Sequence, residues 1–162
     1  MSQCVRGRIQ GVWLKHLQVF ADDRGVLAEL ARVDDPYFGT DFAGYGQTTL
    51  TMSYPGVIKA FHWHKAQDDV WFVSKGMIQA VLYDLREDSP TSGMTEVVCM
   101  GEHRPLLLVI PRGVAHGYRV ISHEPAWVVY QTSALYDARD PDEERIAWDD
   151  PRIGFDWVTR PR

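Results

Sequence analysis

The sequence has few cysteines and no long apolar run. Only Cys4 and Cys99 occur among its 162 residues, and neither lies in a CxxC or CxxxC motif. We therefore expect reduced thiols rather than a disulfide framework. Arg6, Arg8 and Lys15 interrupt the N-terminal segment, and no stretch approaches the roughly 18 apolar residues of a membrane span. A soluble cytoplasmic protein that does not enter a membrane is expected.

Basic residues are too few and too scattered to form a nucleic-acid surface. The chain has 17 Lys and Arg against 22 Asp and Glu, a net charge of −5 and a pI near 5.6. This balance argues against a nucleic-acid partner but is compatible with a basic pocket for a small anion. With 45% hydrophobic residues, the chain can bury one core and is too short for two ordinary domains, so a single domain over 1–162 is predicted.

The sequence also lacks a helical apolar period of useful length. Segment 137–144 is expected to form a helical turn or two at most. Short β-rich runs separated by turn residues dominate instead: TTLTMS, VIKAFHWH, VWFVS, MIQAVLYDL, PLLLVIPRG and AWVVYQTS. They predict an all-β sandwich or barrel, closed to protect its edges. The charged run DARDPDEER, residues 137–145, is interpreted as a solvated connection without a role in chemistry.

The run VIKAFHWH brings two histidines to one side of a predicted strand. Strict alternation places Ile58, Ala60, His62 and His64 on one face, with Val57, Lys59, Phe61 and Trp63 on the other. A single histidine in such a strand would be half-exposed on a sheet surface about as often as it would be buried inside a barrel. Two on one face, beside small and aliphatic neighbours and before an acidic cluster, favour the interior of a barrel.

Two segments resemble the cupin signatures. The first is matched by the order and spacing of Gly56, His62, His64, Asp69 and Gly76, with Asp69 where Glu is usual. The core of the second is matched by Pro111, Gly113 and His116, although its leading Gly is missing at the usual distance and Val120 stands where Asn is common. The resemblance implies strands that face each other across a small barrel.

On that resemblance, four side chains are expected to converge: His62, His64, Asp69 and His116. Three imidazoles and a carboxylate would suit a divalent transition metal. We nevertheless expect no metal and no other cofactor, because the family that the chain resembles most closely works without one. If a metal is bound, these four residues are its expected ligands.

A closer resemblance covers the chain from about Asp22 to Trp157. It rests on the segments DDRGVLAEL, QTTLTMSYPGVIKAFHWH, YDLREDSPTSG, IPRGVAHGYRV, VVYQTSALY and IAWDDPRIGFDW. In these the chain resembles the dTDP-4-dehydrorhamnose 3,5-epimerase family of the cupin superfamily. The resemblance implies an all-β, cupin-type (jelly-roll) barrel and a homodimer. It also implies an enzyme that moves protons beside the keto group of a nucleotide-linked 4-keto-6-deoxyhexose.

The same resemblance implies residue roles. His62 falls at the position of the general base, and Tyr130 at that of a phenol that protonates the opposite face of the enolate; both roles suit their chemistry. The remaining expected substrate contacts are Arg24 and Lys59 at the pyrophosphate, Glu29, Gln47 and Tyr136 near nucleotide or sugar, and His64 and His116. Plainer interpretations are a turn residue for Arg24, a cap for Gln47 and a core position for Tyr136.

The chain departs from the family at two catalytic positions. A Lys that stabilises the enolate oxygen is replaced by Asp69, beside Asp68. The C-terminal segment that carries the Asp partner of the catalytic His has no counterpart, because the sequence ends soon after Trp157. We therefore expect Asp69, or another acid, to orient His62.

A third departure leaves the reaction open. The family reads HYQ or HFQ where this sequence reads HWHK, followed by Gln67, and this pattern is closer to the nucleotide-sugar 3,4-ketoisomerases. The favoured hypothesis is an epimerase. The alternatives are a 3,4-ketoisomerase and a metal-binding cupin, either a dioxygenase or a binding module. For the homodimer, the run RIQGVWL, 8–14, is expected to supply a pairing edge.

Overall fold

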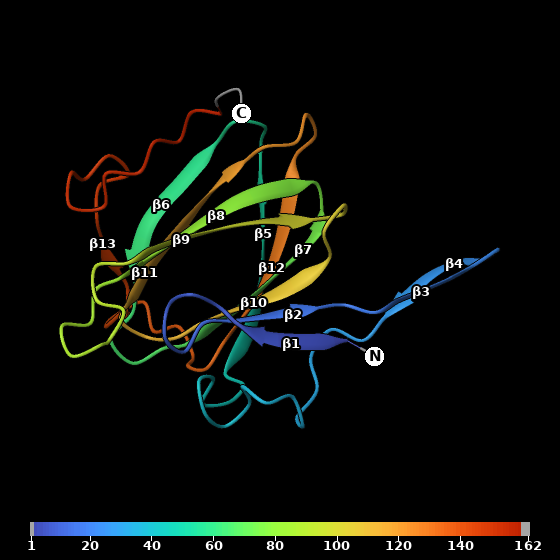
Figure 1. Ribbon diagram of the computed structural model, residues 1–162, viewed down its shortest axis with the longest axis horizontal. Helices are drawn as coiled ribbons and strands as arrows, with labels where there is room; N and C mark the ends of the chain where they lie inside the picture. Colours follow the sequence, from blue (N-terminus) through green and yellow to red (C-terminus); the bar gives the residue numbers. More distant parts are fainter. Residues whose placement is uncertain (1, 160–162) are drawn as a thin grey trace.

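The computed structural model describes residues 2–159 (Figure 1). Within this span the strands are β1 (Gln3–Arg6), β2 (Trp13–His16), β3 (Val19–Asp22), β4 (Gly25–Ala28), β5 (Gln47–Ser53), β6 (Ile58–Trp63), β7 (Asp69–Lys75), β8 (Met77–Asp84), β9 (Thr95–Gly101), β10 (Leu106–Ile110), β11 (Val114–Val120), β12 (Ala126–Thr132) and β13 (Glu144–Arg145). The described span has no helix that could cross a membrane. Segment 137–144, where a helical turn or two was expected, has one hydrogen-bonded turn, from Asp140 N–H to the Asp137 carbonyl.

The strands form two large antiparallel sheets and one separate hairpin. The first sheet has the order β1-β2-β10-β7-β12-β5, and the second has the order β13-β6-β11-β8-β9. Strands β3 and β4 pair only with each other and project from the body (Figure 1). The predicted all-β, cupin-type jelly roll is confirmed. The expected closure into a barrel is not observed among residues 2–159, because each of the two large sheets keeps its own edge strands.

The main core lies between the two sheets. Alternate side chains of β10 and β8 belong to one buried cluster: Leu106, Leu108, Ile110, Ile78, Ala80 and Leu82. Burying a Leu or Ile side chain contributes roughly 1.5–3 kcal/mol, so this cluster holds the sheets face to face. The same two sheets supply the walls of the pocket described below.

The expected pairing edge at 8–14 is wrong. Residues 8–11 form a turn, and β2, which begins at Trp13, is hydrogen-bonded on both sides, to β1 and to β10. The edge strands of this sheet are β1 and β5. Local sequence predicts a strand here but cannot show that another strand of the same chain already covers it.

Candidate active site

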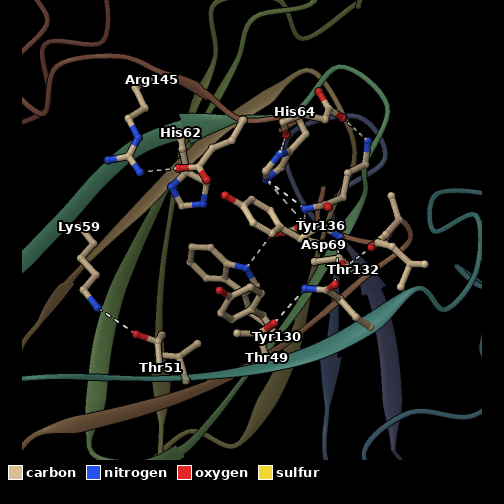
Figure 2. A pocket seen from close by; sticks show the side chains of 18 of the residues that line it. Thr49, Thr51, Lys59, His62, His64, Asp69, Tyr130, Thr132, Tyr136 and Arg145 are labelled. Carbon is tan, nitrogen blue, oxygen red and sulfur yellow. Dashed lines mark hydrogen bonds and ion pairs between the residues drawn. The ribbon is translucent and has the colours of Figure 1, made fainter. Parts of the chain in front are cut away.

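A cavity of about 500 Å³ lies between the sheets. Strands β6 and β11 of one sheet, strands β5, β7 and β12 of the other, and the segment 134–145 line it (Figure 2). This volume lies within the usual range for small-molecule sites. Polar and charged side chains from both sheets point into it.

Strand β6 carries one extra residue opposite β11. His62 pairs with His116 and Lys59 with Tyr118, so two β6 residues lie opposite the single residue Gly117. A Cβ atom at position 117 would lie 2.6 Å from a Cα atom of β6, so glycine permits this close approach. The extra residue makes a bulge, which changes the direction of the side chains that follow.

Because of the bulge, the side chains of β6 do not alternate strictly between the two faces, as had been predicted. Lys59 lines the pocket together with His62 and His64, whereas Ile58 and Ala60 pack in a cluster on the other side of the sheet. Placing Ile58 and Ala60 on the histidine face was therefore wrong. The side chain of Lys59 lies in the pocket instead and brings a positive charge there.

The structure brings together His62, His64, Asp69 and His116. One nitrogen or oxygen of each lies within 4.8 Å of the corresponding atom of every other. The rings of His62 and His116 are in edge contact, with centroids 4.2 Å apart. The four residues come from β6, the turn after it, the start of β7, and β11.

Asp69 is the buried carboxylate of this cluster, with only 2% of its surface exposed. Its Oδ1 accepts a hydrogen bond from Gln67 Nε2 at 2.8 Å, and its Oδ2 accepts one from Trp71 Nε1 at 3.2 Å. Burial raises the pKa of Asp69, opposed by the nearby imidazoles and by these hydrogen bonds. The structure describes no hydrogen bond between Asp69 and His62, the residue that it was expected to orient.

The two buried imidazoles, His64 and His116, have fixed orientations. His64 Nδ1 donates to the Asp142 carbonyl, and His116 Nδ1 donates to the Val114 carbonyl at 2.9 Å. Because a carbonyl only accepts, each Nδ1 carries a proton, and Nε2 is the unprotonated nitrogen in the neutral tautomer of either ring. These Nε2 atoms lie 3.8 Å and 3.6 Å from the carboxylate oxygens of Asp69.

His62 is only partly buried and lines the pocket. Burial and, to a smaller extent, the neighbouring His116 lower its pKa to about 3, against the opposite effect of the carboxylates of Asp69 and Glu143. His62 is therefore unprotonated at neutral pH. That is the state in which an imidazole can accept a proton.

Tyr130 faces the pocket from the opposite sheet. It belongs to β12, whereas His62 belongs to β6, and Figure 2 shows the two on different walls of the pocket. Burial raises the pKa of Tyr130, although its hydrogen bond with Thr49 opposes the shift. The phenol is protonated at neutral pH and can donate its proton.

Three more of the sequence-predicted residues line the same pocket. Lys59 Nζ donates to Thr51 Oγ1 at 2.9 Å, and Gln47 Oε1 accepts from the backbone N–H of Tyr136 at 2.9 Å. Gln47 thus combines the plainer role of a cap with a place in the pocket wall. Tyr136 is 61% exposed, so its interpretation as a core residue is excluded.

Arg24 and Glu29 are not part of this pocket within one chain. Arg24 is a turn residue between β3 and β4, paired with Asp22, and 85% of its side chain is exposed. Glu29 follows the hairpin and lies 3.3 Å from Arg32. The structure therefore does not bring these two predicted substrate contacts to the other site residues.

The charged segment 137–145 belongs to the site, so its interpretation as a connection without chemistry was wrong. The carboxylate of Asp142 accepts three hydrogen bonds, of 2.7, 2.8 and 3.0 Å, from the backbone N–H groups of residues 65–67. Glu143 and Arg145 line the pocket and are paired at 2.8 Å. No local motif marks them, because the pairing of β13 with β6 brings them there.

Comparison with known proteins gives one consistent family. The family model described as dTDP-4-dehydrorhamnose 3,5-epimerase matches residues 6–162. The chain is 53% identical over 154 residues to the spore coat polysaccharide biosynthesis protein SpsL of Bacillus subtilis, covering 95% of this chain and 99% of that protein. It is 42% identical over 151 residues to the probable low-salt glycan biosynthesis epimerase Agl13 of Haloferax volcanii, covering 92% and 94%.

A solved structure agrees with these sequence matches. NovW, a 4-keto-6-deoxy sugar epimerase from the novobiocin biosynthetic gene cluster of Streptomyces spheroides, superposes with a TM-score of 0.88 and 27% identity over 98% of this chain and 80% of that one. The family model covers nearly the whole sequence. The chain belongs to the dTDP-4-dehydrorhamnose 3,5-epimerase family.

Proposed function

We propose that this protein is a nucleotide-sugar epimerase that inverts a carbon beside the keto group of a nucleotide-linked 4-keto-6-deoxyhexose. The observation that carries this proposal is the placement of an unprotonated His62 and a protonated Tyr130 on different walls of one pocket. Inversion requires a base on one face of a carbon and an acid on the other.

The proposed reaction has two proton transfers. His62 removes the proton from the carbon next to the ketone, and the electron pair moves onto the keto oxygen to give an enolate. Tyr130 then gives its proton to the opposite face of the same carbon, which restores the ketone with inverted configuration. The carboxylates of Asp69 and Glu143 favour the protonated form of His62.

Substrate binding is proposed for the remaining residues that line the pocket. Lys59 supplies a positive charge for the pyrophosphate, as a single ammonium group rather than a bidentate guanidinium. Gln47 and Tyr136 lie on the wall beside Tyr130 and are proposed to contact nucleotide or sugar. His64 also lines the pocket, and His116 is buried behind the lining; both are proposed to contact the sugar near the carbon that reacts.

The function is tested with dTDP-4-keto-6-deoxyglucose in heavy water. Proton NMR is expected to show loss of the signals at one or both carbons that flank the keto group, together with a product of changed configuration. A product in which the keto group has moved to the neighbouring carbon would identify a 3,4-ketoisomerase instead. No exchange at either carbon, with folded protein, would contradict both.

A homodimer is proposed to complete the site. The β3–β4 hairpin exposes Phe20, Val26 and Leu27, and carries Arg24 away from the pocket of its own chain. Apolar side chains exposed on a projecting hairpin favour contact with a second copy. In that arrangement Arg24 would reach the pyrophosphate in the partner's pocket.

Mixing two inactive variants tests this arrangement. Arg24→Ala and His62→Asn are each expected to have low activity, but heterodimers contain one site with both native residues. Denaturing and refolding an equimolar mixture should therefore restore about a quarter of the parent activity, since half of the dimers are mixed and each has one working site. Light scattering should show a dimer at micromolar concentration. A monomer, or no recovery on mixing, would show that Arg24 does not act across an interface.

The remaining proposals concern the surroundings of the enzyme. We propose that it works in the cytoplasm, which the two free cysteines, Cys4 and Cys99, support. Its expected partners are the nucleotide-linked sugar and a second copy of the chain. Neither a nucleic acid nor a membrane is expected to bind.

A further inference from the structure

We propose that Arg145 is a further substrate-binding residue, whose guanidinium group holds the diphosphate of the nucleotide-linked sugar beside Lys59. None of the contacts implied by the family resemblance lies on β13, the strand that carries Arg145. The inference deepens the proposed function and rests on it, because a nucleotide-linked substrate is what brings a diphosphate into this pocket.

The charge of the pocket is the first argument. Among residues 2–159, Lys59 and Arg145 are the only Lys or Arg side chains that line it. Four carboxylates line it as well: Asp69, Asp140, Asp142 and Glu143. A diphosphate carries a negative charge on each phosphate, and the single ammonium group of Lys59 compensates one of them. Within one chain, Arg145 is the group that can compensate the other.

The chemistry of Lys59 is the second argument. Lys59 stands where the family resemblance places an Arg, and its Nζ already donates to Thr51 Oγ1 at 2.9 Å. An ammonium group is a point charge, whereas a guanidinium presents a planar fork that matches two phosphate oxygens. Arg145, on the strand next to that of Lys59, supplies the fork that position 59 lacks.

The rigidity of β13 is the third argument. It pairs with β6 so that Arg145 lies opposite His62, the proposed base. After Arg145, backbone hydrogen bonds of 2.9 Å join Ile146 and Phe61 in both directions. Before it, the carboxylate of Asp142 accepts hydrogen bonds from the backbone of the turn that follows β6. The backbone of Arg145 is therefore held in place before a ligand arrives, which lowers the entropic cost of binding.

The side chain of Arg145 lies at the opening of the pocket. It is 82% exposed, and Figure 2 shows it on the same side of the pocket as Lys59. A sugar bound beside His62 would have its phosphates outside it, toward this opening. Arg145 is thus placed to contact the phosphates and not the carbon that reacts.

Glu143 is the competitor for this guanidinium. Arg145 Nη2 donates to Glu143 Oε1 at 2.8 Å, and the guanidinium makes no other hydrogen bond in the described part of the chain. Its remaining N–H donors are open to a ligand. Exposed ion pairs contribute little to stability, so a phosphate can displace Glu143 at small cost. Arg145 and Glu143 should therefore have opposite effects on affinity.

Binding of dTDP alone tests the proposal, with dissociation constants measured by isothermal titration calorimetry. Arg145→Ala is expected to weaken binding about 10–100-fold, the usual effect of losing charge-assisted hydrogen bonds. Arg145→Lys should recover part of this loss, because it keeps the charge but not the fork. Glu143→Gln should tighten binding by about two- to fivefold, because it removes the competing carboxylate.

Arg152→Ala is the matched control. Arg152 pairs with Asp150, two residues before it, at 2.9 Å, as Arg145 pairs with Glu143, but it does not line the pocket. Its removal should leave the affinity for dTDP unchanged. Circular dichroism checks that each variant is folded.

Kinetics separate a binding role from a catalytic one. With dTDP-4-keto-6-deoxyglucose, Arg145→Ala should raise KM by the factor found for dTDP, while deuterium exchange at saturating substrate stays within about threefold of the parent. A fall in exchange at saturation as large as the loss of affinity would overturn the assignment of Arg145 as a binding residue.

Four binding results would also overturn the proposal: no binding of dTDP by the parent, parent-like binding by folded Arg145→Ala, an equal loss in Arg152→Ala, or unchanged or weaker binding by Glu143→Gln. Deuterium exchange by the parent is measured separately. Exchange by the parent, together with normal dTDP binding by Arg145→Ala, would remove this inference and leave the epimerase proposal standing. Weakened dTDP binding by Arg145→Ala without any exchange by the parent would do the reverse.

Discussion

Replacing His62 with Asn is expected to abolish both solvent deuterium exchange and product formation. Asn cannot accept the proton from the carbon beside the ketone, so no enolate forms and no later step can compensate. A general base typically contributes about 10²–10⁴-fold, and the loss should lie in this range. The measurement is the rate at which the proton NMR signals of the hydrogens on the two carbons beside the ketone disappear in heavy water.

The matched control for this variant is His123→Asn. His123 is exposed and lies outside the pocket, so the same substitution there should leave exchange at the parent rate. Exchange by folded His62→Asn at the parent rate would show that the base is assigned wrongly. His64 and His116 would then be the residues to replace.

Replacing Tyr130 with Phe is expected to separate exchange from inversion. His62 can still remove a proton and return it, or a deuteron, to the same face, so deuterium enters while configuration is retained. Inversion should fall by about 10²–10⁴-fold, because no acid remains on the opposite wall. Proton NMR measures both quantities in one sample, from signal loss and from the coupling constants of the product.

Tyr54→Phe is the control for the loss of a phenol. Tyr54 is exposed, lies between β5 and β6, and does not line the pocket. It should leave both rates unchanged. Inversion by Tyr130→Phe at the parent rate would show that another group, or water, supplies the second proton.

The strands were predictable because their signals are local. The run TTLTMS lies within β5, and AWVVYQTS contains β12 between turn residues, as periodicity and turn chemistry indicate. The meeting of His62 and His116 followed from a resemblance of two separated segments to known signatures. Both predictions use information present within short stretches of sequence.

The parts that were missed depend on pairing between distant residues. The family resemblance predicted Lys59 as a substrate contact, but strict alternation placed it on the face opposite the histidines. Lys59 reaches the pocket because β6 bulges opposite Gly117, and nothing in the β6 sequence shows which residue lies opposite. Asp142 and Glu143 read as solvated charges in a connecting segment, but β13 places them beside His62 and His64. Alternation and composition describe one segment at a time, so they cannot show which strands pair or which residues lie opposite each other.

The position of β13 at the margin of its sheet has a consequence for biosynthesis and engineering. The other strands of both large sheets are complete at Thr132, so the core can assemble before the segment 137–145 has left the ribosome. The pocket wall is then added to sheets whose other strands are already complete, and Ile153 and Trp157 pack against Phe61 after it. Exposed side chains of this segment, such as Arg145, are therefore expected to affect catalysis more than resistance to unfolding.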